Sequence, residues 1–386
     1  MKNASPAELA ALRERALRLQ LSGRAELGAA VRRVMRQNRI VGLSLVLCHP
    51  DGRDETLCFG RARLSPDVPV TPETCFRTAS VSKLVMAFGA LALIEDGLLE
   101  PDEDIGLLLG YPVRSPHAPD TPITLRMLLT HTSGLCDEGN YGTRGMQPGT
   151  TLCELLEHPA NWLPHAPGSA FHYSNLGAGV AGVLMERATD LPLDAVMQRR
   201  VFSPLGIRAS YDPRRIQPAD DLANGYSVRL FLPPRLRYDA AALAARAPEP
   251  FDPERDYLCA AGRMITDSPG MARLIRLLAG TGEDSGVLSH DMLRAMRAPQ
   301  SGIGGIGRCE RGLNVAFLPG VFPGHDALGH QGVAYGMCAE LFADPARGTG
   351  VGVMTSGTRL VRTPPLMRAG FDLLTLGFAA LEATDQ

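Results

Sequence analysis

Residues 76–94 read FRTASVSKLVMAFGALALI, and the interpretation of the whole chain starts from this stretch. Its apolar run, Leu84 to Ile94, is too short to span a bilayer and is typical of a buried helix. We expect one helix over residues 80–98, with Gly97 near its end. Ser80 then lies at the N-terminus of this helix, and Lys83 lies one turn later on the same face.

The spacing of Ser80 and Lys83 has a chemical meaning. A serine hydroxyl is a weak nucleophile until a neighbouring base removes its proton. A lysine among apolar side chains can have a pKa low enough to act as that base, whereas an arginine cannot lose its proton in a protein. The helix N-terminus also offers a free backbone N–H to developing negative charge. The pair therefore predicts nucleophilic catalysis; the simpler alternative is a helix cap beside a solvated lysine.

Lysine is almost absent from the rest of the chain. The 386 residues include 39 lysines and arginines together, and only Lys2 and Lys83 are lysines. Such a bias is typical of a GC-rich genome and has no functional meaning by itself. It nevertheless leaves the single interior lysine at the position where a removable proton is needed.

The composition excludes several classes of protein. A hydrophobic fraction of 45% and a charged fraction of 21% indicate a globular chain with one large or two smaller domains. A net charge of −2 gives no reason to expect nucleic acid or a membrane as a partner. The eight cysteines form no CxxC pair, and residues 1–37 contain no apolar signal-peptide core, so we expect reduced thiols in a cytoplasmic protein. The alternative is a secreted protein whose leader peptide has been removed.

We expect neither a metal nor any other cofactor. The histidines show no metal-ligand spacing. Residues 302–307, GIGGIG, fit the pattern of a dinucleotide-binding loop but lack the surrounding βαβ unit, so we interpret them as a flexible loop.

Two further motifs lie later in the chain. Tyr173 and Asn175 occur in PGSAFHYSNLG at 167–177, where a phenol beside a cation can act as an acid or base. The amide of Asn175 can bind both a substrate carbonyl and the lysine. His330 and Gly332 follow in GHQGV at 329–333, at the end of a strand-like run, and a glycine there allows close approach to the strand edge.

Together the three motifs resemble the serine β-lactamase, penicillin-binding protein and esterase superfamily, in its class C-like branch. Supporting segments are similar too. They are FRTAS at 76–80, ITLRMLLTHTSGL at 123–135 and AAGRM at 260–264. The resemblance extends from about residue 25 to the C-terminus.

The resemblance implies a role for each matching residue. Ser80 is expected to be the acylated nucleophile, and Lys83 and Tyr173 to share the acid and base work. Asn175 is expected to orient Lys83 and the substrate. The backbone N–H groups of Ser80 and Val333 are expected to form the oxyanion hole. His330 and Gly332 are expected to line the edge strand beside the substrate, with His330 placing a donor or partial charge near a substrate carboxylate or ester.

The third motif departs from the β-lactamases of this branch, which carry Lys where this chain has His330. Histidine at that place goes with esterases, D-aminopeptidases and some DD-peptidases of the superfamily. We therefore expect a hydrolase of a small ester, amide or peptide. The alternatives are an acyltransferase or weak β-lactamase using the same site, and a non-catalytic acyl-binding sensor.

The order of predicted elements indicates an α+β fold. Strand-like runs lie at both chain ends, at 40–48 and 55–60 and again near 312–318, 326–333, 336–343 and 349–355, with helical stretches between. We expect an antiparallel sheet flanked by helices, formed by residues 1–80 and 257–386, with an inserted mostly helical domain at 81–256.

Two long stretches of the inserted domain, 136–149 and 227–256, are predicted to be substrate-facing loops. The first contains Cys136 and Tyr141. We expect His131, in the segment before it, to make a structural hydrogen bond.

Overall fold

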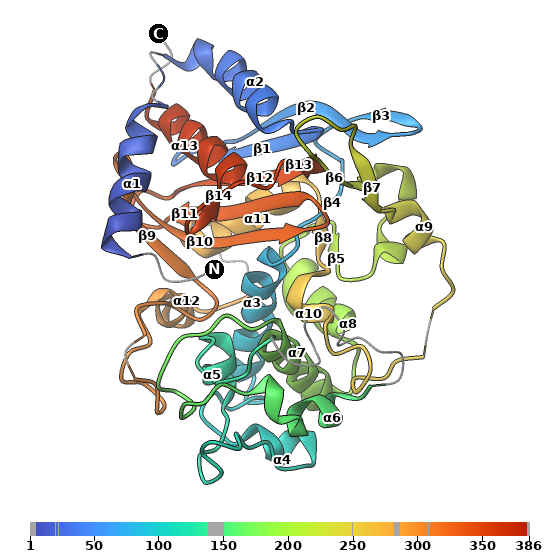
Figure 1. Ribbon diagram of the computed structural model, residues 1–386, viewed down its shortest axis with the longest axis vertical. Helices are drawn as coiled ribbons and strands as arrows, with labels where there is room; N and C mark the ends of the chain where they lie inside the picture. Colours follow the sequence, from blue (N-terminus) through green and yellow to red (C-terminus); the bar gives the residue numbers. More distant parts are fainter. Residues whose placement is uncertain are drawn as a thin grey trace.

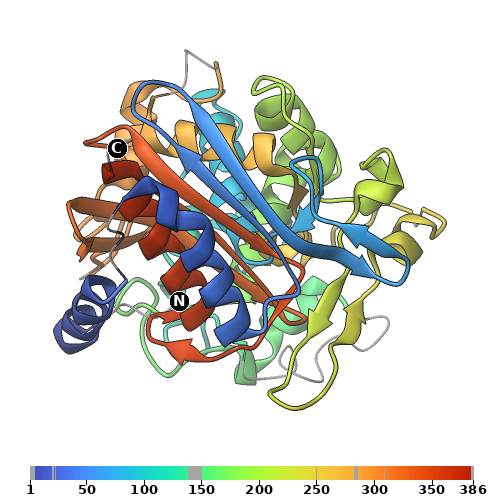
Figure 2. The ribbon, with the colours of Figure 1, turned by 90° about the horizontal axis from the view of Figure 1, so that it is seen from above.

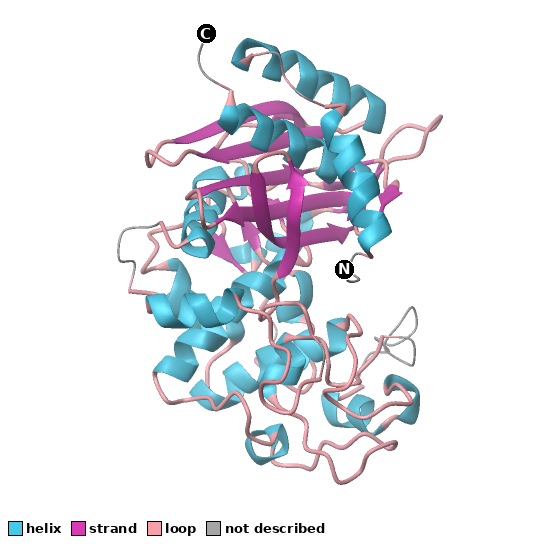
Figure 3. Cartoon of the chain, turned by 90° about the vertical axis from the view of Figure 1, so that its left-hand side faces the viewer, coloured by secondary structure: helices cyan, strands magenta, loops and turns pink. Residues whose placement is uncertain are grey.

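The computed structural model describes residues 5–383 except 20, 22, 138–149, 249, 282–285 and 308. A seven-stranded antiparallel sheet occupies one half of the molecule, and most helices occupy the other (Figures 1 and 3). The predicted α+β class and the antiparallel sheet built from both chain ends are confirmed. In order across the sheet, the strands are β3 (Asp67–Pro69), β2 (Asp54–Leu64), β1 (Gly42–Cys48), β12 (Thr349–Thr355), β11 (Met337–Asp344), β10 (His325–Ala334) and β9 (Ala316–Phe322).

Helices cover both faces of the sheet. β1 and β12 are buried along their whole length, as expected for strands whose two faces are covered. One face packs against α1 (Pro6–Leu17), α2 (Leu27–Asn38) and α13 (Arg368–Glu382), and Figure 2 shows α2 and α13 crossing it. The other face packs against α11 (Ser268–Ala279) and α3 (Val81–Glu95).

Local sequence explains where several helices begin. α1 starts with a capping box, in which Ser5 and Glu8 satisfy each other's backbone N–H groups and Pro6 takes the first position. α3 is apolar almost all round and is buried on every side up to Leu93, as expected of a helix between two layers.

The rest of the chain is mostly helical, between the two groups of strands. Its helices are α4 (Ile105–Leu109), α5 (Leu125–Leu129), α6 (Leu152–Glu157), α7 (Asn175–Thr189), α8 (Leu193–Met197), α9 (Ala240–Ala244), α10 (Cys259–Gly262) and α12 (His290–Arg297). Short 3-10 or π turns lie at Arg24–Glu26, Pro159–Asn161, Gln198–Phe202, Pro213–Arg215 and Ala219–Asp221.

Three smaller sheets accompany the main sheet. β4 (Phe76–Arg77), β8 (Ile265–Thr266) and β5 (Ala209–Ser210) form one of them; β13 (Gly357–Thr358), β6 (Gly225–Ser227) and β7 (Arg235–Tyr238) form another; β14 (Arg362–Thr363) and β15 (Leu366–Met367) form a two-stranded pair. β5, β6 and β7 lie inside the predicted 81–256 insertion, yet β5 and β6 pair with strands outside it. This pairing links the two predicted domains, and the domain boundaries at residues 80 and 256 stay a prediction.

The stretch 227–256 differs from the prediction that it is a loop. It contains β7 and α9, because Arg235 to Tyr238 pair with β6 and Asp239 caps α9 with its side chain. β9 also begins at Ala316 rather than near residue 312. Both deviations involve short segments whose pairing is set by tertiary contacts rather than by a local pattern.

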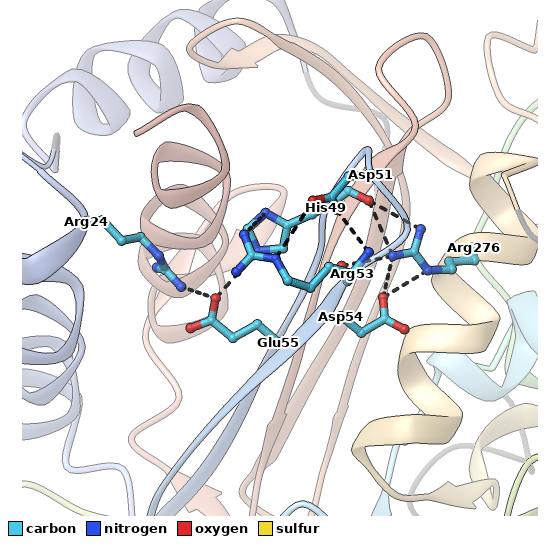
Figure 4. Close-up of polar contacts among 7 residues, drawn as sticks. All are labelled: Arg24, His49, Asp51, Arg53, Asp54, Glu55 and Arg276. Carbon is cyan, nitrogen blue, oxygen red and sulfur yellow. Dashed lines mark hydrogen bonds and ion pairs between the residues drawn. The ribbon is translucent and has the colours of Figure 1, made fainter. Parts of the chain in front are cut away.

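A polar network fastens the β1–β2 hairpin to α11 (Figure 4). The Arg276 guanidinium donates to the Asp54 carboxylate at 2.9 Å and to the backbone carbonyls of His49 and Arg53. On the other side of the hairpin, Glu55 accepts from Arg24. The turn at the far end of the sheet is thereby held between two helical segments.

None of the described helices combines the length and the apolarity that crossing a bilayer requires.

Candidate active site

Ser80 lies directly before the first turn of α3. Figure 1 shows α3 where the main sheet meets the helical part. The Ser80 side chain does not cap the helix, so its hydroxyl stays available for other contacts. The preceding residue, Ala79, has a left-handed φ of 48°, which costs energy for a residue with a side chain. This strained turn brings Ser80 to the helix N-terminus, where the first backbone N–H groups have no partner within the helix.

Lys83 is fully buried and its amine makes three hydrogen bonds. Nζ donates to Ser80 Oγ at 3.1 Å, to Asn175 Oδ1 at 2.7 Å and to the carbonyl oxygen of Ala261. Burial lowers the pKa of Lys83 to about 7, and the negative charge of Asp137 opposes this shift. The amine can therefore give up its proton near neutral pH while in contact with the serine hydroxyl.

Asn175 begins α7 and is held on both sides. Its Oδ1 accepts from Lys83, and its Nδ2 donates to Asp137 Oδ2 at 2.8 Å. The Asp137 carboxylate also accepts from the backbone N–H groups of Asn175 and Leu176 at the start of α7. A carboxylate is favourable at this end of a helix, so Asp137 fixes the amide that touches Lys83.

Sequence reasoning missed Asp137. Its neighbour Cys136 is predicted to be a loop residue; the Cys136 thiol is buried and contacts the carbonyl oxygen of Ala160. Tyr141 and most of the 136–149 stretch lie outside the described residues. A carboxylate is favourable at a helix N-terminus, which is the one signal for Asp137 in the sequence. Asn175 is 38 positions away, however, so the sequence does not indicate that the two residues are in contact.

Tyr173 lies beside the same amine. Lys83 Nζ is 5.0 Å from the centre of the Tyr173 ring. Burial raises the pKa of the Tyr173 phenol above its usual range, and a hydrogen bond with Ser80 opposes the shift. The phenol is therefore protonated at neutral pH and can donate a proton to a neighbouring oxygen.

The free edge of β10 closes the site opposite α3. β9 pairs with β10 only as far as Gly329, and beyond it no described strand covers this edge. A methyl group on Gly332 would lie 2.1 Å from the carbonyl oxygen of Thr78 and 2.8 Å from the amide nitrogen of Ser80. The group that approaches Gly332 closely is thus the backbone of residues 78–81, which includes Ser80. This contact brings Val333 next to the start of α3.

His330 is fully buried on this strand. Its Nδ1 lies 2.6 Å from the backbone carbonyl of Gln331, which can only accept, so Nδ1 carries the proton and Nε2 has a lone pair. Burial, together with the positive charges of Lys83 and Arg311, holds the pKa of His330 well below its usual range. His330 is therefore neutral, and its role of placing a donor or partial charge near the substrate stays a prediction.

His131 supports the tyrosine from behind. Its ring lies 4.6 Å from the Tyr173 ring, and its Nδ1 accepts the backbone N–H of Ser174 at 3.2 Å. The expected structural hydrogen bond is therefore present. Burial lowers the pKa of His131 well below its usual range, so this histidine is also neutral.

Three separated parts of the chain thus meet at α3, α7 and β10. They bring together all seven predicted site residues: Ser80, Lys83, Tyr173, Asn175, His330, Gly332 and Val333. Within the described ranges, no group of three His, Cys, Asp or Glu side chains is placed to hold a metal ion.

Comparison with known proteins gives matches over most of the chain. The Beta-lactamase family model matches residues 27–369. Esterase EstB of Burkholderia gladioli is 32% identical over 212 residues, which cover 50% of this chain and 53% of the esterase. The chain spans about half the length of the curated relatives it matches.

Solved structures agree over a longer range. A structure described as EstCE1, a hydrolase with promiscuous acyltransferase activity, has a TM-score of 0.71 and 25% identity, covering 93% of this chain and 99% of that one. The D-amino acid amidase of Ochrobactrum anthropi SV3 has a TM-score of 0.68 at 20% identity, covering 92% and 98%, and shows the fold alone. The family match, the shared fold and the arrangement of the three motifs lead to one conclusion: this chain belongs to the Beta-lactamase family.

Proposed function

We propose that this protein is a serine hydrolase that forms an acyl-enzyme on Ser80 from a small ester or amide. One observation carries the proposal. Lys83 Nζ is within 3.1 Å of Ser80 Oγ, and burial lowers the pKa of this amine to about 7. A neutral amine touching the hydroxyl is the arrangement that activates a serine.

The residues divide the work as follows. Lys83 accepts the hydroxyl proton while Ser80 Oγ bonds to the substrate carbonyl carbon. The negative charge on the carbonyl oxygen is stabilised by the N–H groups of Ser80 and Val333. Tyr173, protonated at neutral pH, donates its proton to the leaving oxygen or nitrogen and recovers one from Lys83. Water then attacks the ester of Ser80, and the same groups transfer its proton back to the serine.

We propose esters as the preferred substrates. A neutral His330 provides no positive charge to bind a substrate carboxylate, so recognition of β-lactams through such a charge is not favoured. The similarity to EstB and to EstCE1 supports the same choice.

Acyl transfer is a second candidate, because EstCE1 is described as a hydrolase that also has promiscuous acyltransferase activity. An alcohol in place of water would attack the same acyl-enzyme. Measuring the ratio of ester to acid products with increasing alcohol separates the two: a ratio that stays at zero excludes transfer.

The decisive experiment is labelling with a fluorophosphonate probe followed by mass spectrometry. We expect a covalent adduct on the peptide carrying Ser80, and none in Ser80→Ala. Ser82→Ala is the matched control, because the Ser82 hydroxyl bonds to the backbone of Ala79 and Met264 instead of to Lys83. An absent adduct in the wild type would reject the hydrolase and favour the acyl-binding sensor.

Lys83→Arg tests the proton transfer. The substitution keeps a positive charge but supplies no removable proton. We expect acylation to fall by at least about a hundredfold, measured as the rate of probe labelling. Labelling at the wild-type rate would exclude Lys83 as the base.

A further inference from the structure

Two segments of the surface carry many arginines and no acidic residue. Residues 27–39 include four arginines, residues 225–238 include three, and neither range contains Asp or Glu. The chain as a whole has a net charge of −2. Among the described residues, none of these arginines forms an ion pair with a carboxylate; they are Arg32, Arg33, Arg36, Arg39, Arg229, Arg235 and Arg237.

The two segments lie side by side. The Arg39 guanidinium, at the end of α2, donates to the backbone carbonyls of Arg229 and Leu230 in the β6–β7 hairpin. A groove of about 660 Å³ lies between α2, β2 and this hairpin. Arg32, Arg36 and Arg39 line it together with apolar Met35, Phe59 and Pro234, and the Arg32 guanidinium is 5.0 Å from the centre of the Phe59 ring. The groove is therefore both cationic and apolar.

The tip of the hairpin is apolar and exposed. Leu230, Phe231 and Leu232 are 48%, 90% and 52% exposed. In Figure 2 the hairpin projects from the lower edge of the molecule. A contiguous apolar tip of this kind marks an interaction site, because water contact at a phenylalanine is unfavourable.

We propose that this surface docks onto a bilayer rich in anionic phospholipids. The tip residues 230–232 enter the boundary between headgroups and acyl chains, and the seven arginines contact the phosphates around them. Apolar side chains flanked by cations match the layering of such a membrane, where negative charge lies directly above an apolar phase. A projecting tip can insert into a deformable lipid bilayer without a matching pocket. A second copy of the chain would have to supply a pocket surrounded by carboxylates.

The net charge of the whole chain gives no reason to expect a membrane partner, because it does not show that these seven arginines gather on one surface. The hairpin also leads to the candidate active site: Tyr238, at its base, stacks on Tyr335, two residues after Val333. The six residue steps from Leu232 to Tyr238 extend at most about 22 Å. A docked molecule would therefore hold its site near the membrane surface, within reach of amphiphilic esters. The docking itself does not depend on the proposed hydrolysis.

Co-sedimentation with vesicles tests the docking. We expect the full chain to sediment with vesicles containing about one third phosphatidylglycerol at low salt, and to stay in solution with pure phosphatidylcholine. Phe231→Ser should lower the bound fraction by about tenfold. Arg32→Gln and Arg36→Gln should each weaken binding by about fivefold. Leu107→Ser and Arg199→Gln, exposed positions on the helical part, are the matched controls and should bind as the wild type does.

Two results would overturn the proposal. One is no sedimentation with anionic vesicles, or equal sedimentation with both kinds. The other is a wild-type dimer in sedimentation equilibrium that Phe231→Ser dissociates without any effect on vesicles, which would assign the tip to a second copy. Hydrolysis of a soluble ester should be unchanged in Arg36→Gln, which lies on α2 outside the predicted substrate-facing stretches, so failure of the docking and failure of the hydrolase proposal are separately visible.

Discussion

The amine of Lys83 is balanced between two opposing effects. Burial favours its neutral form, and the nearby Asp137 carboxylate favours the charged one. Asp137 also holds Asn175, whose Oδ1 accepts from that amine. The Asp137 carboxylate therefore influences both the protonation and the position of the proposed base, Lys83, although it is not itself hydrogen-bonded to Ser80.

Asp137→Asn should separate these effects. Because activity requires neutral Lys83, wild-type kcat/KM should rise with pH through about 7. Removing the Asp137 charge lowers the Lys83 pKa further, so this rise should move to lower pH. Loss of the hold on Asn175 should reduce the plateau value about tenfold to a hundredfold.

The matched control for that variant is Asp104→Asn. Asp104 caps α4 through the N–H of Gly106 in the same manner, but at a distance from the site. Its pH profile should match the wild type. An Asp137→Asn profile with an unmoved midpoint would show that Asp137 does not act on Lys83.

At the scale of elements, the site depends on how closely β10 approaches the start of α3. Gly332 has no space for a side chain, since the nearest atoms are backbone atoms of Thr78 and Ser80. Gly332→Ala should push the strand from the helix, abolish probe labelling of Ser80 and destabilise the fold by about 1–3 kcal/mol. Gly28→Ala on α2, where a methyl group would meet only the end of Arg32 at 3.6 Å, should keep both labelling and stability. Normal labelling of Gly332→Ala would mean that the strand edge does not form the oxyanion hole.

The hairpin network of Figure 4 makes a separate prediction about stability. Arg276 is almost fully buried and bridges Asp54 and two backbone carbonyls, which a lysine cannot reach in the same geometry. Arg276→Lys should lower the free energy of unfolding in urea by about 2 kcal/mol, with unchanged kcat. Arg294→Lys, whose partner Asp291 is exposed, should change it by less than about 0.5 kcal/mol. Equal effects of the two variants would contradict the bridging role of Arg276.

At the scale of elements, the sequence predicts contacts between residues that are close together along the chain better than contacts between distant ones. The Ser80–Lys83 pair and the α3 helix are predictable because a helical turn is a local pattern. The β6–β7 hairpin forms where the sequence predicts a loop, since strands of three and four residues give too weak a pattern and their register is set by β13. The neutral state of His330 is not predictable, because it follows from burial that only the packed structure creates.

At the scale of the whole molecule, Glu340 is a buried acid outside the candidate site. Glu340 is fully buried on β11 and accepts from the side chain of Gln331 at 2.5 Å. The orientation of the Gln331 amide is set by Met367, whose N–H donates to Gln331 Oε1. The second oxygen of Glu340 has no hydrogen-bond partner among the described residues, which suits a protonated acid better than a carboxylate.

Burial raises the pKa of Glu340 well above its ordinary value, 4.5, so the folded chain keeps a proton that the unfolded chain releases. Above that value the free energy of unfolding should therefore fall by about 1.4 kcal/mol per pH unit from this group, until the folded acid ionises. Glu340→Gln removes the titration, so the variant should gain stability relative to the wild type as pH rises above 4.5, measured by urea unfolding. Glu186→Gln is the matched control: burial raises the pKa of Glu186 only to about 7, so its effect should level off there. Parallel pH dependence of the wild type and Glu340→Gln above pH 4.5 would show that the pKa of Glu340 is not raised in the folded chain.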